Sequence, residues 1–514
     1  MVLLSASAAS ITPPPHRRTA NYRPSIWDDD YIQSLPIGFE EESHLRRREE
    51  LKERVRQLIL KQKDAVEQLE LVDALLRLGV QYHFELEIEC VLNSMSSSIT
   101  NTSNMSEDIN LHCSALLFRL LREHGTDSSN LLGSNPIFSS LNAMIVSFKG
   151  RIQHDVKELL SLHEASFLAV EGEDELEEAG EMAAEQLRRL RKNTSLDPKL
   201  AEHIDHALEL PLHWRMTRLH TRWYIDFYEK QENADSGLLE LAKLDFNMVQ
   251  SAYKMELKEI SRWWRNLGLA SEELSFARDR LVEAYFWSVG CSYEPHFWRC
   301  RKEIAKIGCL LSTIDDIYDV YGSLEELELF TRAVDCLDLS KAYLLEARWY
   351  YSGYTPTLNE YIENGWMTIA GPLLSACAYC LSEDLTMEAL NNLRFYPDVV
   401  RQSSLIARLY DDLGTSNDEI LRGDVAKSIQ CHMKHKNVSE KAAREHIRWL
   451  IRKHWKTMNE GLIANQQLLG SFKSHVINFP RMAQFIYQYG DGHGKPEVET
   501  RVQVISLIVE PIPL

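Results

Sequence analysis

The segment Leu310-Leu-Ser-Thr-Ile-Asp-Asp-Ile-Tyr-Asp-Val-Tyr-Gly322 changes from apolar to acidic within one predicted helix. Asp315 and Asp319 are four positions apart, so a helix places both carboxylates on one face. Like charges at that spacing destabilise a helix by roughly 0.2–0.5 kcal/mol. The closing glycine is expected to end the helix, and Ser323 with Glu326 is expected to cap the next one. The negative end of the helix dipole then repels the acids too, which suggests a bound cation; the alternative is an exposed acidic helix end.

A second stripe of oxygen atoms is predicted in the segment Arg408-Leu-Tyr-Asp-Asp-Leu-Gly-Thr-Ser-Asn-Asp-Glu419. Asp411, Thr415 and Glu419 follow one another at intervals of four, so a helix places them in line. Carboxylate and hydroxyl oxygens suit Mg²⁺ or Mn²⁺ rather than zinc. Arg408 lies one turn before Asp411, where it can contact an anion held by the same metals.

Two further arginines stand in the tripeptide Arg278-Asp-Arg280. Alternating guanidinium groups can grip a phosphate through paired hydrogen bonds. Taken alone, the tripeptide is more simply explained as surface charge. Together with the two oxygen stripes, it predicts a diphosphate that is bound through magnesium.

The composition is that of a globular protein and excludes several other classes. Hydrophobic residues make up 44% and charged residues 26% of the 514 residues, and only 22 glycines and 16 prolines interrupt them, which favours helices. The net charge of −19 argues against a nucleic-acid partner. The sequence contains no run of about 18 apolar residues, the length that would predict a membrane-spanning helix.

The chain divides where its composition changes. The polar stretch 229–237 is the best candidate for a boundary between two helical domains. Clusters of Ser, Thr, Asn and Gly at 96–106 and 126–140 predict loops. We therefore expect a short leader at 1–20, an N-terminal helical domain at 21–232 and a C-terminal metal-binding catalytic domain at 233–514.

The acidic and basic motifs resemble those of class I terpene synthases. Asp315 to Asp319 is similar to their DDxxD motif, and Asp411 to Glu419 to their (N/D)DxxSxxxE motif with Thr in the Ser position. Arg278-Asp-Arg280 resembles their RxR motif. Arg17-Arg18, followed after eight residues by Trp27, resembles the RRx₈W motif of plant monoterpene synthases that form cyclic products. Further family-like segments are 207–216, 351–358 and 489–494.

The resemblance implies an all-α fold. An N-terminal helical, α/α-barrel-like domain would precede a C-terminal class I terpenoid synthase α-barrel that holds the active site. The N-terminal strand with Arg17, Arg18 and Trp27 would fold over the pocket as a cap. The first 27 residues lack Asp and Glu and resemble the end of a transit peptide. A plastid location is therefore expected; the shortness of the leader keeps the cytosol as the alternative.

The resemblance also implies a role for each motif residue. Three Mg²⁺ ions (or Mn²⁺) would be held by Asp315, Asp319, Asp411, Thr415 and Glu419. The diphosphate would be contacted by Arg278, Arg280, Arg408, Asp315, Asp319 and Asp411. Asp316 would support the first motif from beside it. The aromatic rings of Trp287 and Tyr487 would stabilise the carbocation that remains after the diphosphate leaves.

The chain departs from the family between its two metal motifs. Only 92 positions separate Asp319 from Asp411, because the segment 329–340 runs directly into the helix that begins near Lys341. About two helices' worth of chain is absent there. The loss would expose apolar surface and admit water to the cation. The sequence therefore leaves open that the α-barrel is incomplete.

The expected activity is a magnesium-dependent conversion of geranyl diphosphate to a monoterpene, most simply a cyclic one, with release of diphosphate. One alternative is a sesquiterpene synthase acting on farnesyl diphosphate. Another is a catalytically impaired, splice-type variant. A chain-elongating prenyltransferase is disfavoured because such enzymes carry two DDxxD motifs and this chain shows one. A monomer without nucleic-acid or membrane partners is expected.

Overall fold

The structure is a computed structural model. It describes residues 20–101, 110–124, 136–149, 155–193, 195–269, 274–334, 338–382, 396–421, 423–464, 472–495 and 498–514. Within these ranges every regular element is helical, which confirms the predicted all-α fold. The predicted cap residues Arg17 and Arg18, like nearly all of the predicted leader, lie outside the described residues.

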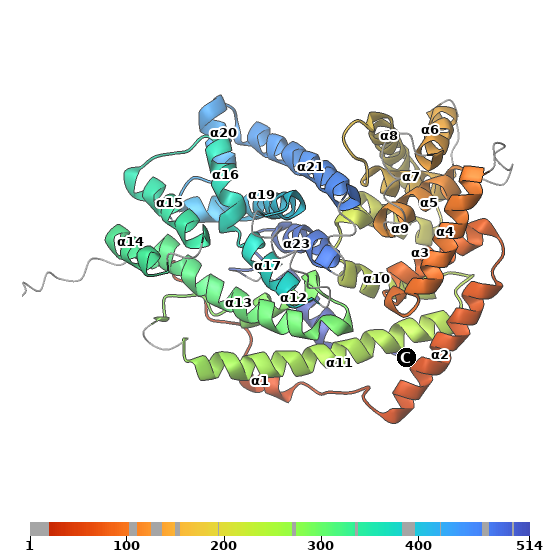
Figure 1. Cartoon of the computed structure of the whole chain (residues 1–514), viewed down its shortest axis with the longest axis horizontal. Helices are drawn as coiled ribbons and strands as arrows, with labels where there is room; N and C mark the ends of the chain where they lie inside the picture. The colour runs from red at the N-terminus through yellow and green to blue at the C-terminus, as the bar shows by residue number, and fades with distance from the viewer. Residues whose placement is uncertain are drawn as a thin grey trace, which may run out of the picture.

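The first half of the chain forms ten α-helices within the described residues, and those from α2 to α9 gather on the right of Figure 1. Their bounds are α1 (Asp29–Ser34), α2 (Glu42–Lys61), α3 (Ala65–Arg77), α4 (Glu85–Asn101), α5 (Leu111–His124), α6 (Pro136–Lys149), α7 (Val156–Ser166), α8 (Asp174–Arg191), α9 (Pro198–Glu209) and α10 (Thr217–Glu229). Short 3-10 helices occur at Gln81–His83 and Leu212–Trp214. Aspartates begin several of these helices: the side chains of Asp64, Asp155 and Asp197 accept hydrogen bonds from first-turn amides.

Both predicted loops are partly helical. Helix α4 continues through Ser96 to Asn101, and α6 begins at Pro136. The predictions were wrong at these residues because burial of the apolar side chains on the same helices outweighs the weak helix propensity of Ser and Asn. The remainders of both loops lie outside the described residues.

The second half begins with the long helix α11, and its remaining helices lie mostly on the left of Figure 1. Their bounds are α11 (Ser236–Leu267), α12 (Leu281–Cys291), α13 (Trp298–Asp316), α14 (Leu324–Ala333), α15 (Asp338–Ser352), α16 (Leu358–Thr368), α17 (Gly371–Cys380), α19 (Asp398–Leu421), α20 (Ser428–Lys436), α21 (Glu440–Ala464), α23 (Phe472–Tyr487) and α24 (Val498–Val504). A 3-10 helix occupies Pro295–Phe297, and π-helical turns occupy Ile317–Tyr321 and Ile505–Val509. The polar stretch 229–237 contains the turn between α10 and α11.

The two halves share one buried core. Buried apolar side chains of α2–α9 and of α11, α12, α19, α21 and α23 form one continuous cluster, while those of α14 and α15 belong to two smaller clusters beside it. Helix α21 links the halves through Asn459, which is 4% exposed and whose amide donates to the carbonyls of Phe167 and Ala169 at 3.0 and 3.1 Å. The ring of His213 lies 2.9 Å from the side-chain oxygen of Asn459.

The acidic segment folds much as predicted, with one difference. Helix α13 is regular only as far as Asp316, and the π-helical turn Ile317–Tyr321 completes it. The capping box of Ser323 and Glu326 is confirmed. Gly322 is required for close packing, since a Cβ there would lie 2.5 Å from a methyl of Leu327. π-Helical turns often occur at functional sites because they change the direction of a side chain within a helix.

Helices α16 and α17 are separated by a break in the backbone. Ala370 adopts a left-handed conformation with φ of 60°, and α17 starts directly after it with Gly371 and Pro372. A Cβ on Gly371 would lie 2.3 Å from the hydroxyl of Ser404 on α19, so glycine allows the two helices to touch. At the break the amide of Ala370 donates to the carbonyl of Met367, three residues earlier, at 2.9 Å, whereas the carbonyl of Ala370 still accepts from the amide of Leu374 at 3.0 Å.

Candidate active site

A cavity of about 170 Å³ lies among the C-terminal helices. Its walls come from α12, from α13 with the π-helical turn, and from α15, α16, α17, α19 and α23. The loop after α23 contributes Asp491 and His493. Segments far apart in the sequence therefore meet at one site.

The first acidic motif divides between the cavity and the structure behind it. Asp315 and Asp319 line the cavity. Asp316 is fully buried and holds Arg278, whose backbone amide donates to Asp316 Oδ2 at 2.7 Å and whose Nε lies 3.0 Å from Asp316 Oδ1. Arg278 also lines the cavity, and its Nη2 donates to Asp315 Oδ2 at 2.5 Å.

The second acidic motif divides in the same way. Asp411, Thr415 and Glu419 all line the cavity from one face of α19. Asp412, which is fully buried, faces away and accepts hydrogen bonds from the hydroxyl of Tyr361 at 2.8 Å and from the amide of Ser428 at 3.2 Å. In both motifs one aspartate thus supports the scaffold while its neighbour faces the cavity.

Arg408 connects this second motif to the helix break. Its Nη1 donates to Asp411 Oδ2 at 2.6 Å, while its Nε donates to the carbonyl of Gly365 at 3.1 Å. Arg408 lines the cavity and is 8% exposed. Its guanidinium is therefore held in place before any ligand binds.

Two charged residues that the sequence did not single out also line the cavity. Lys427 is 3% exposed, and its Nζ lies 3.7 Å from Glu419 Oε2 and 3.5 Å from Asp424 Oδ2. Glu346 on α15 is 5% exposed and accepts a hydrogen bond from Thr368 at 2.8 Å. A lone acid among apolar helix residues was a usable signal for Glu346. Lys427 lies between helices and follows no periodicity.

The electrostatics of the cavity favour added positive charge. Burial, reinforced by Asp315, raises the pKa of Asp319 well above its usual value. Burial likewise raises the pKa of Asp411 to about 7 and that of Glu419 to about 8. Carboxylates crowded out of water resist ionisation unless cations join them. The cavity therefore suits divalent metal ions.

The oxygen donors that line the cavity fit Mg²⁺, which keeps water and phosphate ligands, better than a metal ion that is held by protein side chains alone. In the part of the chain that the structure describes, no three His, Cys, Asp or Glu side chains converge closely enough to hold one ion. Mg²⁺ typically takes only one or two protein carboxylates and completes its shell with water and substrate phosphates. Oxygen donors on two opposite walls, with room between them, match that habit.

Three neighbouring aromatic rings contribute to the apolar part of the cavity. Trp287 on α12 lies 5.7 Å from the ring centroid of Phe479 and 6.1 Å from that of Tyr487, both on α23. Ile369 and Ala370, at the break between α16 and α17, line the same cavity. The predicted pocket residues Trp287 and Tyr487 are thus brought together.

Arg280 and Trp27 are not brought into this cavity. Arg280 is 2% exposed, and its Nη2 donates to the carbonyls of Arg23 at 3.0 Å and Gly494 at 2.9 Å. Trp27 donates from its indole nitrogen to Glu283 at 3.1 Å. This geometry does not favour the direct diphosphate contact that the sequence predicts for Arg280, because the guanidinium donates to backbone carbonyls instead.

Comparison with known protein families identifies both halves of the chain. Residues 26–208 match the terpene synthase N-terminal domain. Residues 265–339 and 335–457 match the metal-binding domain of the terpene synthase family in two pieces. The break between the two pieces falls where the sequence predicts a missing segment.

A curated relative agrees with this assignment. The chloroplastic myrcene synthase of Quercus ilex is 42% identical over 557 residues, which span 99% of this chain and 92% of the relative. That alignment is longer than this chain of 514 residues, so the relative contains residues that have no counterpart here.

Solved structures show the same fold. A limonene synthase with 2-fluorolinalyl diphosphate matches with a TM-score of 0.90 and 37% identity, over 97% of this chain and 100% of that one. An isoprene synthase from grey poplar leaves, in complex with three Mg²⁺ ions and dimethylallyl-S-thiolodiphosphate, matches with a TM-score of 0.78 and 36% identity, over 95% and 99%. None of the described helices is both long and apolar enough to cross a membrane. The chain belongs to the terpene synthase family, a family of lyases, and carries both its N-terminal domain and its metal-binding domain.

Proposed function

We propose that this chain is a magnesium-dependent monoterpene synthase that ionises geranyl diphosphate, releases diphosphate and converts the allylic cation to a monoterpene, most simply a cyclic one. The observation that supports this best is the pairing of two oxygen-donor sets on opposite walls of one cavity with an aromatic floor. The charged end matches a metal diphosphate, and the aromatic end matches an isoprenoid cation.

We assign the metal ligands to the residues that face the cavity from α13, its π-helical turn and α19. These are Asp315, Asp319, Asp411, Thr415 and Glu419. Three Mg²⁺ ions are expected, and Mn²⁺ can replace them on the same oxygen donors. When bound, the ions neutralise charge on the leaving diphosphate as the allylic C–O bond breaks.

The chain's own cations stabilise the same leaving group. Arg278 enters from one side of the cavity, and Arg408 and Lys427 enter from the other. Arg408 and Lys427 are buried, the side chain of Arg278 is 11% exposed, and each is already paired with a carboxylate, so little reorganisation is needed when a diphosphate arrives. Preorganised donors of this kind lower the barrier by stabilising charge that develops in the transition state.

The aromatic rings act after the C–O bond has broken. The faces of Trp287, Phe479 and Tyr487 offer diffuse negative charge that stabilises a desolvated cation. Exclusion of water from this space prevents early capture of the cation.

The cavity must enlarge to admit its substrate. Its volume of about 170 Å³ is smaller than the roughly 300–1,000 Å³ of ordinary ligand pockets. The loop 490–495, which lines the cavity, and residues 20–27, which contact its residue Arg278 through Tyr22, belong to no helix. We expect these segments to open for entry and to close for reaction.

A catalytically impaired variant is a second candidate, and a specific observation favours it. The metal-binding domain matches in two pieces that overlap at residues 335–339, where the sequence predicts that about two helices' worth of chain is absent. A sesquiterpene synthase that uses farnesyl diphosphate is the remaining alternative. The similarity of Arg17, Arg18 and Trp27 to the cyclic monoterpene motif argues for geranyl diphosphate.

The remaining assignments are part of the same proposal. The domains are 21–232 and 233–514, and the leader 1–20 with Arg17, Arg18 and Trp27 forms the cap. A plastid location is supported by the word chloroplastic in the names of several relatives. We expect the enzyme to work as a monomer.

The test is to incubate the full chain with MgCl₂ and either geranyl or farnesyl diphosphate and to identify volatile products by gas chromatography–mass spectrometry. Monoterpenes from geranyl diphosphate support the proposal, and sesquiterpenes alone favour the alternative. A matched chain carries the corresponding segment of the Quercus ilex relative inserted after Leu339. Product from the matched chain only would identify the present chain as the impaired variant.

A further inference from the structure

Two segments from opposite ends of the chain, which we call covers, contact residues that form or adjoin the candidate active site. The first is residues 20–27, in which the ring of Tyr22 lies 5.0 Å from the guanidinium carbon of Arg278. The second is the loop 490–495 after α23, in which His493 lies 3.2 Å from the hydroxyl of Ser312 on α13. Asp491 and His493 of this loop line the cavity.

A single guanidinium is bonded to both segments. Arg280 caps the start of α12, and its Nη2 donates to the carbonyl of Arg23 in the first segment and to that of Gly494 in the second. Its Nη1 donates to the carbonyl of Asp279 at 2.7 Å. Because all of these acceptors are backbone carbonyls, Arg280 responds to the positions of the segments rather than to their side chains.

Each segment also has its own attachment to the body of the protein. The first is fixed at Trp27, whose indole donates to Glu283 on α12. The second is fixed at Lys495, whose Nζ lies 2.8 Å from Asp418 on α19. Within the loop, the amide of Gly494 donates to Asp491 Oδ1 at 2.7 Å, so a shift of Gly494 moves the cavity-lining Asp491.

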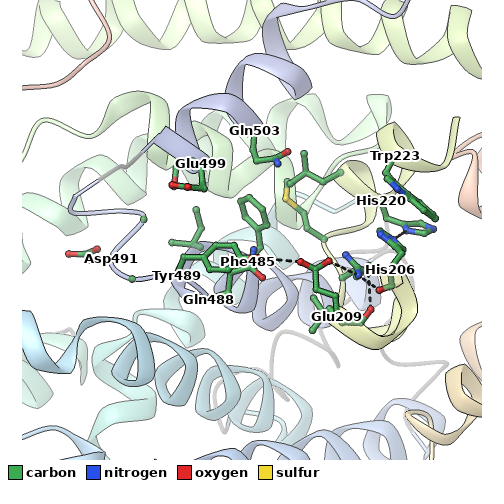
Figure 2. A pocket seen from close by; sticks show the side chains of 18 residues that line it. His206, Glu209, His220, Trp223, Phe485, Gln488, Tyr489, Asp491, Glu499 and Gln503 are labelled. Carbon is green, nitrogen blue, oxygen red and sulfur yellow. Dashed lines mark hydrogen bonds and ion pairs between the residues drawn. The ribbon is translucent and has the colours of Figure 1, made fainter. Parts of the chain in front are cut away.

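The loop has room to move outward. Behind it lies a second cavity of about 540 Å³, lined by α9 and α10 on one side and by α23, the loop and α24 on the other (Figure 2). Asp491 lines both cavities, so the loop is the partition between them. Gly490, with φ of 133°, stands at the start of the loop in a conformation that only glycine adopts easily.

We propose that Arg280 is a positioning residue that couples the closure of the N-terminal segment 20–27 to the closure of the loop 490–495. The coupling itself does not depend on the proposed function, but its effect on catalysis rests on that function. When both carbonyls are bonded, the two covers hold each other in place through one charged group. When either cover opens, Arg280 loses one acceptor and the other cover loosens.

Cooperative closure has a chemical consequence. An active site with one cover open admits water, whose oxygen adds to the carbocation and which then loses a proton to solvent to give an alcohol. A guanidinium bonded to both covers makes such half-open states rarer. Arg280 would thereby raise the proportion of hydrocarbon over alcohol products without contacting the diphosphate.

The test measures hydrogen–deuterium exchange in the full chain without substrate, so it does not depend on catalysis. Arg280→Met keeps the length of the side chain and removes its donors. We expect about tenfold faster exchange in peptides from both covers, since a hydrogen bond to a charged group is lost from each. Arg262→Met is the matched control, because Arg262 donates to Gln33 of α1 at 2.8 Å and belongs to α11, outside both covers.

The coupling itself is tested from the other side. Trp27→Leu loosens the first cover at its own attachment, and we expect faster exchange in the loop 490–495 as well. In the Arg280→Met background, Trp27→Leu should change only the first cover. The proposal is overturned if Trp27→Leu leaves loop exchange unchanged, or if Arg280→Met alters one cover alone.

A binding measurement separates positioning from direct contact. Titration with inorganic pyrophosphate and MgCl₂ should show less than about threefold weaker affinity in Arg280→Met and more than about tenfold weaker affinity in Arg278→Met. Equal losses would show that Arg280 is a diphosphate ligand, which contradicts the proposal. Absence of any synthase activity, with the exchange results as expected, would refute the proposed function and leave the coupling intact.

Discussion

Arg278 and Asp316 are joined at two points: the backbone amide of Arg278 lies 2.7 Å from Asp316 Oδ2, and its Nε lies 3.0 Å from Asp316 Oδ1. Asp316 is fully buried and absent from the cavity wall. The middle aspartate of the first acidic motif therefore holds the arginine that faces the diphosphate site. Asp316 thus belongs to a metal-binding motif but acts through Arg278.

This relationship predicts a graded effect of substitution. Asp316→Asn keeps the shape of the side chain but removes the charge that fixes Arg278. We expect kcat/KM for geranyl diphosphate to fall about 10- to 100-fold, because a hydrogen bond to a charged group is worth about 1.5–3 kcal/mol. Steady-state assays check this, with Asp412→Asn as the corresponding change on α19. A loss as complete as that of Asp315→Ala would instead place Asp316 among the metal ligands.

The raised pKa values of the second motif predict a link between protons and metal. In the metal-free protein, burial raises the pKa of Asp411 to about 7 and that of Glu419 to about 8. Between pH 6 and 8 these groups hold protons that a metal must displace. Affinity for MgCl₂ with pyrophosphate should therefore increase as pH rises towards about 8, with proton release.

Isothermal titration in two buffers of different ionisation enthalpy measures the released protons. Glu419→Gln should release fewer protons than the unaltered chain. The stability of the metal-free protein depends on pH in the opposite direction to its metal affinity. Between about pH 4 and 8 the folded protein binds more protons than the unfolded protein, so its free energy of unfolding falls as pH rises in that window. Affinity independent of pH would contradict the assignment of these ligands.

The aromatic floor predicts an effect on rate and product. Trp287→Leu removes a ring that is worth about 2 kcal/mol to a desolvated cation, so the rate of turnover should fall about 30-fold. Trp287→Phe keeps a smaller ring and should lose less than about tenfold. Single-turnover kinetics with product analysis check both variants. Equal rates for Leu and Phe would show that Trp287 serves packing alone.

The contact between the two halves predicts a specific loss of stability. Asn459→Leu leaves the carbonyls of Phe167 and Ala169 without their donor and removes the partner of His213. We expect the free energy of unfolding to fall by about 2–4 kcal/mol. Glu460→Gln, an exposed change on the same helix, is the control. A change of less than about 0.5 kcal/mol in urea unfolding of Asn459→Leu would mean that Asn459 contributes little to the contact between the halves.

Regular spacing made much of the site predictable from the sequence. Asp411, Thr415 and Glu419 recur every four residues, and one helix brings them to the cavity wall as expected. The mutual repulsion of Asp315 and Asp319 is equally local, and it suggested a cation from the sequence, with an exposed acidic helix end as the alternative. A single helix is enough to bring residues at intervals of four onto one face.

Features that depend on distant contacts were not predictable. Arg280 was expected at the diphosphate, yet its acceptors are carbonyls of Arg23 and Gly494, which lie far away in the chain. Lys427 reaches the cavity from a connection between helices. Backbone carbonyls carry no sequence signal, and connections have no periodicity, so only the folded structure shows these contacts.

The most direct test of the metal-assisted mechanism combines one reaction with one variant. The full chain is incubated with geranyl diphosphate and MgCl₂, and monoterpene and released pyrophosphate are both measured. We predict equal amounts of the two, complete loss of both with EDTA, and complete loss in Asp315→Ala with an unchanged helical circular dichroism spectrum. Turnover that persists in Asp315→Ala with magnesium, or product formed in EDTA, would contradict the central claim that the facing oxygen donors hold the metals that activate the diphosphate.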